Sequence, residues 1–224
     1  EGGRLAIAVD CEAGVSRLAQ ALQQAQAGDK AMDVLVEINV GQNRCGVEPG
    51  EAAVALAQAI QAQPSLRFGG LQAYHGGAQH LRTAAERKAA IEQVLKHVNR
   101  TCHEFDRARI AIPLITGAGT GTMVNEAASG VYGEIQPGSF LFMDADYASN
   151  QRDAAQPMFE HALYVKTQVM SLTTDHAVCD AGHKAHAIDS GLPRLHALPA
   201  ENALRFANGG DEHGVLHPEP QAGN

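Results

Sequence analysis

Hydrophobic and polar positions along the first two thirds of the chain alternate between two spacings. Residues 32–40, MDVLVEINV, have the two-residue period of a strand and are rich in β-branched side chains. One face of that strand carries only apolar residues: Val34, Val36, Ile38 and Val40. The opposite face carries Leu35, Glu37 and Asn39. The polar pair therefore lies near the carboxyl end of an otherwise buried strand.

Helical spacing fills most of the gaps between such strands. Residues 12–27, residues 49–63 and a long segment from Leu81 have apolar residues three and four positions apart. The predicted strands begin near residues 4, 32, 66, 110 and 139, the last covering residues 139–147. Strands that alternate with helices at this spacing indicate βα units and a parallel sheet.

Two architectures fit that pattern, an open doubly wound sheet and a (β/α)8 barrel. Helices cover both faces of an open sheet, so both faces of its strands are apolar. The polar pair of Glu37 and Asn39 favours a barrel whose interior opens into a site. We therefore predict the α/β class, with part of a (β/α)8 barrel at residues 1–150.

The pattern changes after Tyr147. Residues 148–157 are polar and end in proline, as a linker does. Short strand-like segments separated by turn residues follow, at 161–172, 176–182 and 201–210. A second, β-rich domain is predicted over residues 157–224.

Composition excludes several classes of partner. The net charge is −8 and the basic residues form no stripe, which argues against nucleic acid as a partner. The chain has no run of roughly 18 apolar residues, so no membrane span is expected. Its four cysteines are far apart, as reduced thiols of a cytoplasmic protein are.

The strongest local motif is TGAGTGT, residues 116–122, between a predicted strand and a predicted helix. Alternating glycines expose consecutive backbone N–H groups, which bind phosphate together with a helix N-terminus. The alternative is a tight turn that needs glycine only for its backbone angles. The motif lacks the lysine of a phosphate-binding P-loop and the third glycine of a dinucleotide site.

Other candidate residues follow predicted strands. Arg44 offers a planar fork of donors to a ligand, unless it is simply a surface side chain. Tyr74 and His75 end a strand, where barrel sites form, although a lone histidine there is more often structural. By themselves, residues 210–214, GDEHG, are typical of a solvated turn. Asp144 and Asp146 suit structural hydrogen bonds better than a metal site.

Taken together, these segments resemble one family. The strings VEINVGQNRCGV, GLQAYHG, TGAGTGT, YGEIQPGSFLFMDADY, IDSGLP and GDEHG stand in the order and spacing of the D-threonine aldolase and D-serine dehydratase group of alanine-racemase-type enzymes. The β-hydroxyaspartate aldolases and dehydratases of that group are the most similar, through YGEIQPGSFLFMDADY followed by FEHALYVKTQVMS. The resemblance covers residues 4 to 216.

The resemblance implies a barrel with pyridoxal 5'-phosphate (PLP) at its mouth, followed by a β domain. By match to the motifs, Arg44 and Tyr74 lie against the cofactor ring, and the backbone of Gly119, Thr120 and Gly121 holds its phosphate. Asp211 and His213 act from the β domain on the substrate side.

Two features of the family are not found in this chain. Its Schiff-base lysine lies at the end of the first barrel strand, which would precede residue 1, and none of the five lysines here matches it. Its metal-binding pair, His followed two residues later by Cys or Asp, would follow Asn224. The chain therefore resembles the middle of such an enzyme, truncated at both ends, and is expected to be inactive alone.

The implied activity is a metal-assisted lyase reaction on a D-3-hydroxy amino acid, of the 3-hydroxyaspartate or D-threonine type. Cleavage of the Cα–Cβ bond gives glycine plus an aldehyde, and we favour this aldolase outcome. The alternatives are a dehydratase of the same family and a non-catalytic PLP-binding barrel. We also expect a divalent metal (Mg, Mn or Zn) in the full-length enzyme, and a homodimer.

Overall fold

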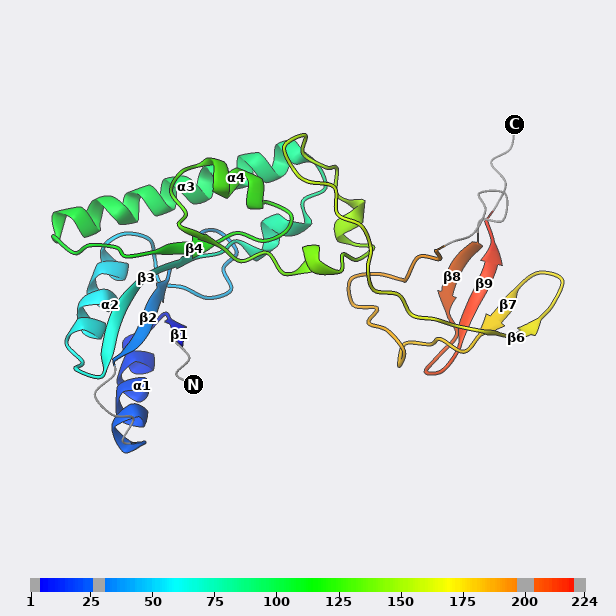
Figure 1. Cartoon of the computed structure of the whole chain (residues 1–224), viewed down its shortest axis with the longest axis horizontal. Helices are drawn as coiled ribbons and strands as arrows, with labels where there is room; N and C mark the ends of the chain where they lie inside the picture. Colours follow the sequence, from blue (N-terminus) through cyan, green and yellow to red (C-terminus); the bar gives the residue numbers. More distant parts are fainter. Residues whose placement is uncertain (1–4, 26–30, 197–203, 220–224) are drawn as a thin grey trace. The chain divides into compact units, whose positions relative to one another are not determined.

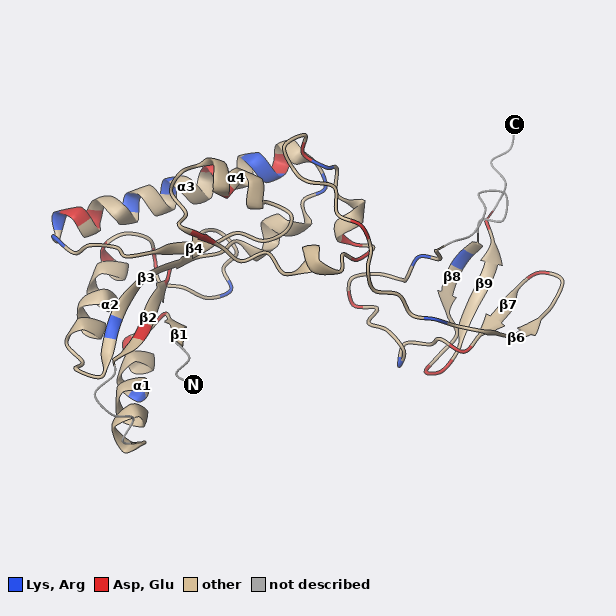
Figure 2. Cartoon of the chain, viewed as in Figure 1, with Lys and Arg blue, Asp and Glu red and all other residues tan. Residues whose placement is uncertain are grey.

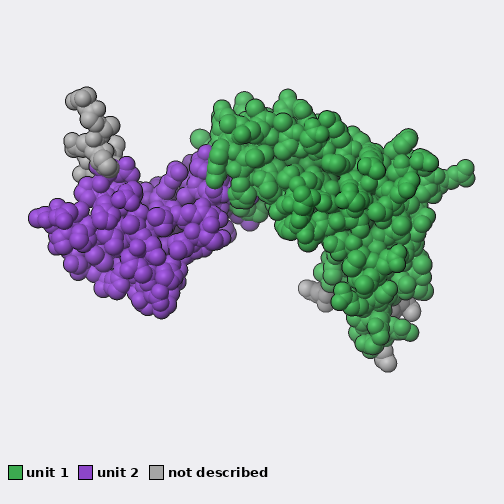
Figure 3. Space-filling model, turned by 180° about the vertical axis from the view of Figure 1, so that it is seen from behind, with its two compact units in different colours: residues 1–140, 150–158 green, residues 141–149, 159–224 purple. Residues whose placement is uncertain are grey.

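The computed structural model describes residues 5–25, 31–196 and 204–219 (Figure 1). The chain divides into two compact units (Figure 3). Unit 1 comprises Glu1–Phe140 with Asn150–Met158, and unit 2 comprises Leu141–Ser149 with Phe159–Asn224. Each unit has its own sheet and its own core.

Unit 1 contains a five-stranded parallel sheet in which the spatial order follows the sequence order. Its strands are β1 (Ala6–Val9), β2 (Met32–Glu37), β3 (Leu66–Ala73), β4 (Ile115–Gly117) and β5 (Glu134–Ile135). Its helices are α1 (Glu12–Gln24), α2 (Glu51–Gln61), the 3-10 helix η1 (Gly76–His80), α3 (Ala84–Arg107) and α4 (Met123–Ala128). A doubly wound sheet would reverse its strand order, so this sequential order is that of a barrel arc.

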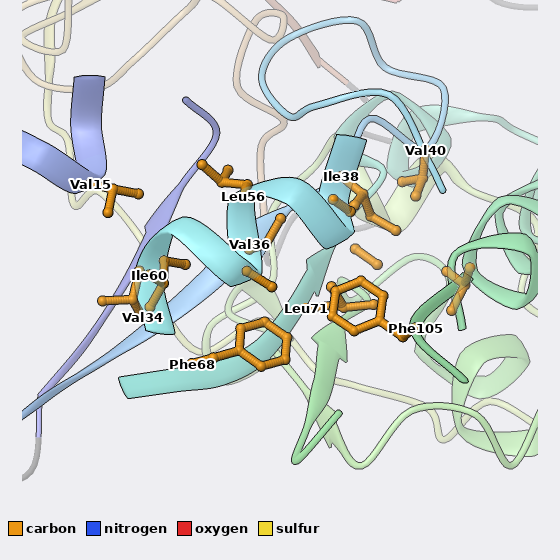
Figure 4. Close-up of a cluster of buried hydrophobic side chains, with 14 of the residues drawn as sticks. Val15, Val34, Val36, Ile38, Val40, Leu56, Ile60, Phe68, Leu71 and Phe105 are labelled. Atoms are coloured by element: carbon orange, nitrogen blue, oxygen red, sulfur yellow. The ribbon is translucent and has the colours of Figure 1, made fainter. Parts of the chain in front are cut away.

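The core of unit 1 lies on one face of the sheet. Val34, Val36 and Ile38 are at most 1% exposed and belong to a single cluster with apolar residues of α1, α2 and α3 (Figure 4). Leu35 and Glu37, on the opposite face, are only partly buried. Helices therefore cover one face, and the prediction of a partial barrel is confirmed.

A β-bulge in β3 adjusts its register against β2. Val34 pairs with Phe68, but Leu35 pairs with Gly70, so one residue of β3 is left over. Gly70 has a φ of 134°, and a Cβ there would collide with the backbone of Leu114. Only glycine satisfies both conditions. The bulge also lets the N–H of Leu71 donate to the carbonyl of Leu114 at 2.8 Å.

Unit 2 contains a four-stranded antiparallel sheet in the order β6-β7-β9-β8. The strands are β6 (Val169–Leu172), β7 (Ala177–Cys179), β8 (Leu204–Asn208) and β9 (Gly214–Pro218). The predicted β-rich character of this part is confirmed, although the segments at 161–172 and 176–182 form shorter strands. Of the segment at 201–210, residues 201–203 lie outside the described residues, and β8 occupies Leu204–Asn208. The sequence analysis missed β9.

The predicted strand at 139–147 is wrong. This segment instead holds the 3-10 helix η2 (Ser139–Leu141) and leads into η3 (Tyr147–Ser149). The N–H of Phe140 donates to the Thr120 hydroxyl, and the Asp144 carboxylate accepts the N–H of Tyr147 at 2.7 Å. These bonds engage backbone groups that a strand would need for pairing. The fifth strand is β5, before Pro137.

Two other predicted boundaries shift. The strand expected at 110–115 begins only at Ile115, because the N–H of Ile110 still donates to the carbonyl of Phe105 at the end of α3. The helix expected from Leu81 begins at Ala84. Thr83 and Glu86 form a capping box there, each side chain accepting the other residue's backbone N–H.

Candidate functional site

The candidate residues of unit 1 follow the carboxyl ends of β2, β3 and β4. In parallel sheets, these ends meet at one edge, where ligands bind. Arg44 comes from the loop after β2, Tyr74 directly follows β3, and the turn at 118–121 follows β4. The three strands are neighbours in the sheet, so the structure gathers these segments at one edge.

Arg44 and Tyr74 are brought into contact. The guanidinium carbon of Arg44 lies 5.6 Å from the centroid of the Tyr74 ring, within cation–π range. A guanidinium nitrogen of Arg44 is also 3.8 Å from Glu37 Oε1. Burial raises the pKa of Glu37 despite the neighbouring Arg44, and burial also raises the pKa of the Tyr74 hydroxyl.

The loop that carries Arg44 is shaped by Asn39. The Asn39 side-chain oxygen accepts the N–H groups of Gly41 and Asn43, at 3.1 and 3.2 Å, and its amide donates to Asn43 Oδ1 at 2.8 Å. Asn43 has a φ of 55°, a conformation that asparagine tolerates better than most residues. Asn39 therefore shapes the loop that carries Arg44.

The side chain of His75 forms a hydrogen bond to the backbone. Its Nδ1 accepts the N–H of Ala78 at 3.2 Å, so Nδ1 carries no proton in this arrangement. Burial lowers the pKa of His75, which favours the neutral ring. His75 thereby caps η1.

The turn after β4 presents unused backbone donors. The carbonyl of Gly119 accepts the N–H groups of Thr122 and Met123, and Gly121 N–H donates to Gln79 Oε1 at 2.9 Å. The N–H groups of Gly119 and Thr120 have no acceptor among the described residues, although both residues are buried. Two consecutive unused N–H groups fit an anion such as a phosphate. Because α4 has only six residues, we assign this capacity to the turn and not to a helix dipole.

A row of polar side chains crosses the sheet just before these strand ends. Glu37 pairs with Gln72 in register, Gln72 with Thr116, and Thr116 with Glu134. Thr116 Oγ1 donates to Glu134 Oε1 at 2.6 Å. The Gln136 amide donates to both Thr116 Oγ1 and Gln72 Oε1, at 2.9 and 2.8 Å. The sheet thus has a polar face opposite its apolar core.

The site also contains a buried carboxyl group that was not predicted from the sequence. Glu126 is 2% exposed and accepts the hydroxyl of Thr122 at 2.7 Å, while its Oε2 has no partner among the described residues. Burial raises the pKa of Glu126 to about 7. Its local signal in the sequence is the spacing of Thr122 and Glu126, four residues apart. The sequence does not show that both side chains are buried.

Asp211 and His213 lie in unit 2, in the turn between β8 and β9. The Asp211 carboxylate is 2.9 Å from His183 Nε2 and 3.0 Å from Lys184 Nζ. The backbone carbonyl of His213 accepts the N–H of Gly209 at 2.9 Å. Within unit 2, therefore, the carboxylate of Asp211 is partnered, and His213 helps to close the turn.

Neither a metal cluster nor a membrane helix is found in the described part of the chain. Over residues 5–25, 31–196 and 204–219, no three His, Cys, Asp or Glu residues lie close enough together to hold a metal ion. Of the helices in those ranges, none has the length and apolar character needed to cross a bilayer. Figure 2 shows Lys and Arg interspersed with Asp and Glu in both units.

Comparison with known families gives one match for each part of the chain. Residues 1–146 match the family described as "Alanine racemase, N-terminal domain". Residues 162–224 match the family described as "Putative serine dehydratase domain".

Individual proteins match both parts together. The chain is 41% identical to D-threonine aldolase from Arthrobacter sp over 220 residues, which cover 98% of this chain and 56% of that protein. It is 37% identical to 3-hydroxy-D-aspartate aldolase from Paracoccus denitrificans (strain Pd 1222), covering 92% of this chain and 54% of that protein. The chain thus spans about half the length of these curated relatives.

A solved structure gives the same result. The crystal structure of D-threonine aldolase from Filomicrobium marinum superposes with a TM-score of 0.89 at 42% identity. The match covers 98% of this chain and 57% of that one.

Proposed function

The chain belongs to the family of the alanine racemase N-terminal domain, and we propose that the complete protein is a PLP-dependent carbon–carbon lyase of D-3-hydroxy amino acids. The family implies PLP as the cofactor. The observation that carries the proposal is the 41% identity to D-threonine aldolase, which extends through both units. The reaction releases glycine and an aldehyde from the substrate.

The residues of unit 1 bind and orient the cofactor in this proposal. The free N–H groups of Gly119 and Thr120 donate to the phosphate, and Gly121 completes the turn. Arg44 and Tyr74, already in contact, lie against the ring. When bound, PLP withdraws electrons from the α-carbon of an amino acid, which is the chemistry that cleavage at that carbon requires.

Asp211 and His213 are proposed to act on the substrate. Both are polar residues of the β8–β9 turn, and Asp211 is exposed. We also propose that the complete protein uses a divalent metal, namely Mg, Mn or Zn. The described residues of this chain provide no cluster of ligands for it.

Two substrates are proposed from the relatives' names, D-threonine and D-3-hydroxyaspartate. A second candidate function, dehydration of the same substrates, is favoured by the match of residues 162–224 to the putative serine dehydratase domain. A third, PLP binding without catalysis, predicts cofactor uptake and no turnover.

Product analysis separates these functions. The complete protein, loaded with PLP and a divalent metal, is incubated with D-threonine or D-3-hydroxyaspartate, and glycine, aldehyde, ammonia and 2-oxo acid are measured. Glycine and aldehyde in equal amounts are expected, with L-threonine as the stereochemical control. Release of ammonia without glycine would instead identify the protein as a dehydratase. Cofactor uptake with no product from either D-substrate would contradict both lyase functions.

We propose that residues 1–150 form the PLP-binding domain and residues 157–224 the start of the β domain. The protein is proposed to be a cytoplasmic homodimer that binds neither nucleic acid nor membrane. All four cysteines are unpaired, as expected of a protein in a reducing compartment. Val169, Met170 and Leu172 are exposed on β6 and offer apolar surface to a second subunit.

A further inference from the structure

Gln79 is a fully buried polar residue that lies between two segments of unit 1. It is 0% exposed and belongs to η1, which follows β3. Its Oε1 accepts the N–H of Gly121 at 2.9 Å, while its Nε2 donates to Thr122 Oγ1 at 2.8 Å and to the His75 carbonyl at 3.2 Å. One side chain thus connects the turn after β4 to the segment that carries Tyr74 and His75.

The orientation of the Gln79 amide is fixed by a directed chain of hydrogen bonds. The Thr122 hydroxyl donates its only proton to Glu126 Oε1 at 2.7 Å, so it can only accept from Gln79. The Nε2 of Gln79 must therefore face Thr122, which leaves Oε1 toward Gly121. All three side chains are at most 2% exposed, so water does not compete for these bonds.

The glycines of the turn are packed against Gln79. A Cβ built at Gly119 would lie 2.5 Å from Gln79 Oε1, and a Cβ at Gly121 would lie 2.6 Å from the Gln79 carbonyl oxygen. A side chain at Gly121 would therefore collide with backbone, and one at Gly119 would displace the Gln79 amide. The sequence suggested a different reason for these glycines, namely that they expose backbone N–H groups to a phosphate.

Gln79 also determines which donors of the turn remain free. It occupies the N–H of Gly121, and the carbonyl of Thr120 is held by Gln156 Nε2 at 3.0 Å. The N–H groups of Gly119 and Thr120 are left without an acceptor among the described residues. A turn fastened at Gly121 and Thr120 presents these two donors together, without a further loss of entropy on binding.

We propose that Gln79 is a positioning residue that holds residues 119–121 in the shape that binds the phosphate of PLP, with Thr122 and Glu126 fixing its amide. This inference rests on the proposed function, because it takes PLP as the ligand. Gln79 itself does not touch the cofactor. Its effect is therefore confined to the phosphate and does not extend to the ring.

The test compares PLP with pyridoxal, which lacks the phosphate. Dissociation constants of the complete protein for both compounds are measured by spectroscopic titration, for the parent and for Gln79→Ala. We expect Gln79→Ala to weaken PLP binding about tenfold or more and pyridoxal binding less than about twofold. Gln93→Ala is the matched control, because Gln93 is exposed on α3 and its side chain accepts a hydrogen bond from Lys96 at the surface.

A second pair of variants keeps the test decisive if Gln79→Ala fails to fold. Thr122→Val preserves the volume of the side chain but removes the acceptor that orients Gln79, whereas Thr122→Ser preserves the hydroxyl. Thr122→Val is expected to weaken PLP binding selectively, and Thr122→Ser to restore it. The melting temperature of each variant without cofactor is measured alongside to identify unfolding.

Two outcomes would overturn the inference while leaving the proposed function intact. In the first, the Gln79 and Thr122 variants bind PLP as tightly as the parent does. In the second, they lose affinity for PLP and pyridoxal equally, which indicates general disorder of the site. If the parent itself binds no PLP, the proposed function fails, and this inference fails with it.

Discussion

Unit 1 buries nineteen apolar residues of its described part in one cluster, whereas the described part of unit 2 buries four. In unit 1, the helices α1, α2 and α3 return to the sheet and cover its apolar face, so neighbouring segments complete one core. Unit 2 has antiparallel strands but no α-helix among its described residues, and its cluster comprises Cys179, Ala181, Phe206 and Leu216. Large apolar residues remain exposed on β6. The comparison indicates that substitutions in unit 1 have larger effects on stability.

Gly70→Ala is expected to have the largest effect. The added Cβ would collide with the backbone of Leu114, and the φ of 134° is one that alanine rarely adopts. Neither strand can move away without breaking the sheet, so the loss of unfolding free energy should exceed about 4 kcal/mol. Urea denaturation of the complete protein, followed by circular dichroism, measures it.

Two glycine controls sharpen the comparison. Gly138 has open space around it and no unusual φ, so Gly138→Ala should change stability by less than about 0.5 kcal/mol. Gly210 in unit 2 has a φ of 124° but nothing within 4 Å of the built Cβ, so Gly210→Ala should cost less than Gly70→Ala. Equal losses for Gly70→Ala and Gly210→Ala would show that packing around the bulge does not matter.

Two aromatic residues compare the cores directly. Phe105 is 0% exposed and stacks on Phe68 with ring centroids 5.4 Å apart, so Phe105→Ala should cost about 3 to 5 kcal/mol. Phe206 is 6% exposed in the smaller cluster, where surrounding groups can collapse into the space, and Phe206→Ala should cost about 2 kcal/mol.

Hydrogen exchange with mass spectrometry assigns each loss to a unit. Phe105→Ala should accelerate exchange in β2, β3 and α3, and Phe206→Ala in β7, β8 and β9. A larger loss from Phe206→Ala would reverse the comparison between the two cores.

The sequence predicted those helices and strands whose formation depends on the spacing of neighbouring residues. The alternation at 32–40 predicted that Val34, Val36, Ile38 and Val40 are buried, because this face packs on helices. The strand predicted at 139–147 failed because its apolar residues carry no sign that Thr120 and Asp144 bind the backbone there. The short β9 was missed because its five residues show no strong alternation.

Some residues of the candidate site could likewise be located from the sequence, and others could not. The sequence located Arg44, Tyr74 and the glycine-rich turn, because strand ends and glycine spacing are visible in it. Their assignment as cofactor-binding residues stays a prediction. Gln79 could not be identified from the sequence, because its bond to Gly121 joins residues 42 positions apart. A contact between segments this far apart in the sequence can be predicted only once it is known that β3 and β4 are neighbours in the sheet.

The two units are also expected to respond differently to pH. In unit 1, burial raises the pKa of Glu126 from 4.5 to about 7, so the folded protein binds this proton more tightly than the unfolded chain. The stabilising contribution is fully present below pH 4.5 and is lost as the pH rises to about 7. In unit 2, hydrogen bonds from the Gln168 N–H and the Thr167 hydroxyl lower the pKa of Asp180. Its contribution has the opposite sign, being lost as the pH falls below 3.8.

Glu126→Gln isolates the first of these effects. The new amide oxygen still accepts the Thr122 hydroxyl, but the side chain no longer ionises. The variant should match the parent near pH 4.5 and be more stable at pH 8, by at most about 3 kcal/mol. Urea denaturation at four values between pH 4.5 and pH 8 gives the difference in unfolding free energy between variant and parent as a function of pH. The contributions of Glu37 and His75 cancel in this difference, because both groups titrate in both proteins. Asp180→Asn, the control in unit 2, should leave this range unchanged. A flat difference curve would mean that Glu126 is solvated in the complete protein, and that the pH response of unit 1 comes from other groups.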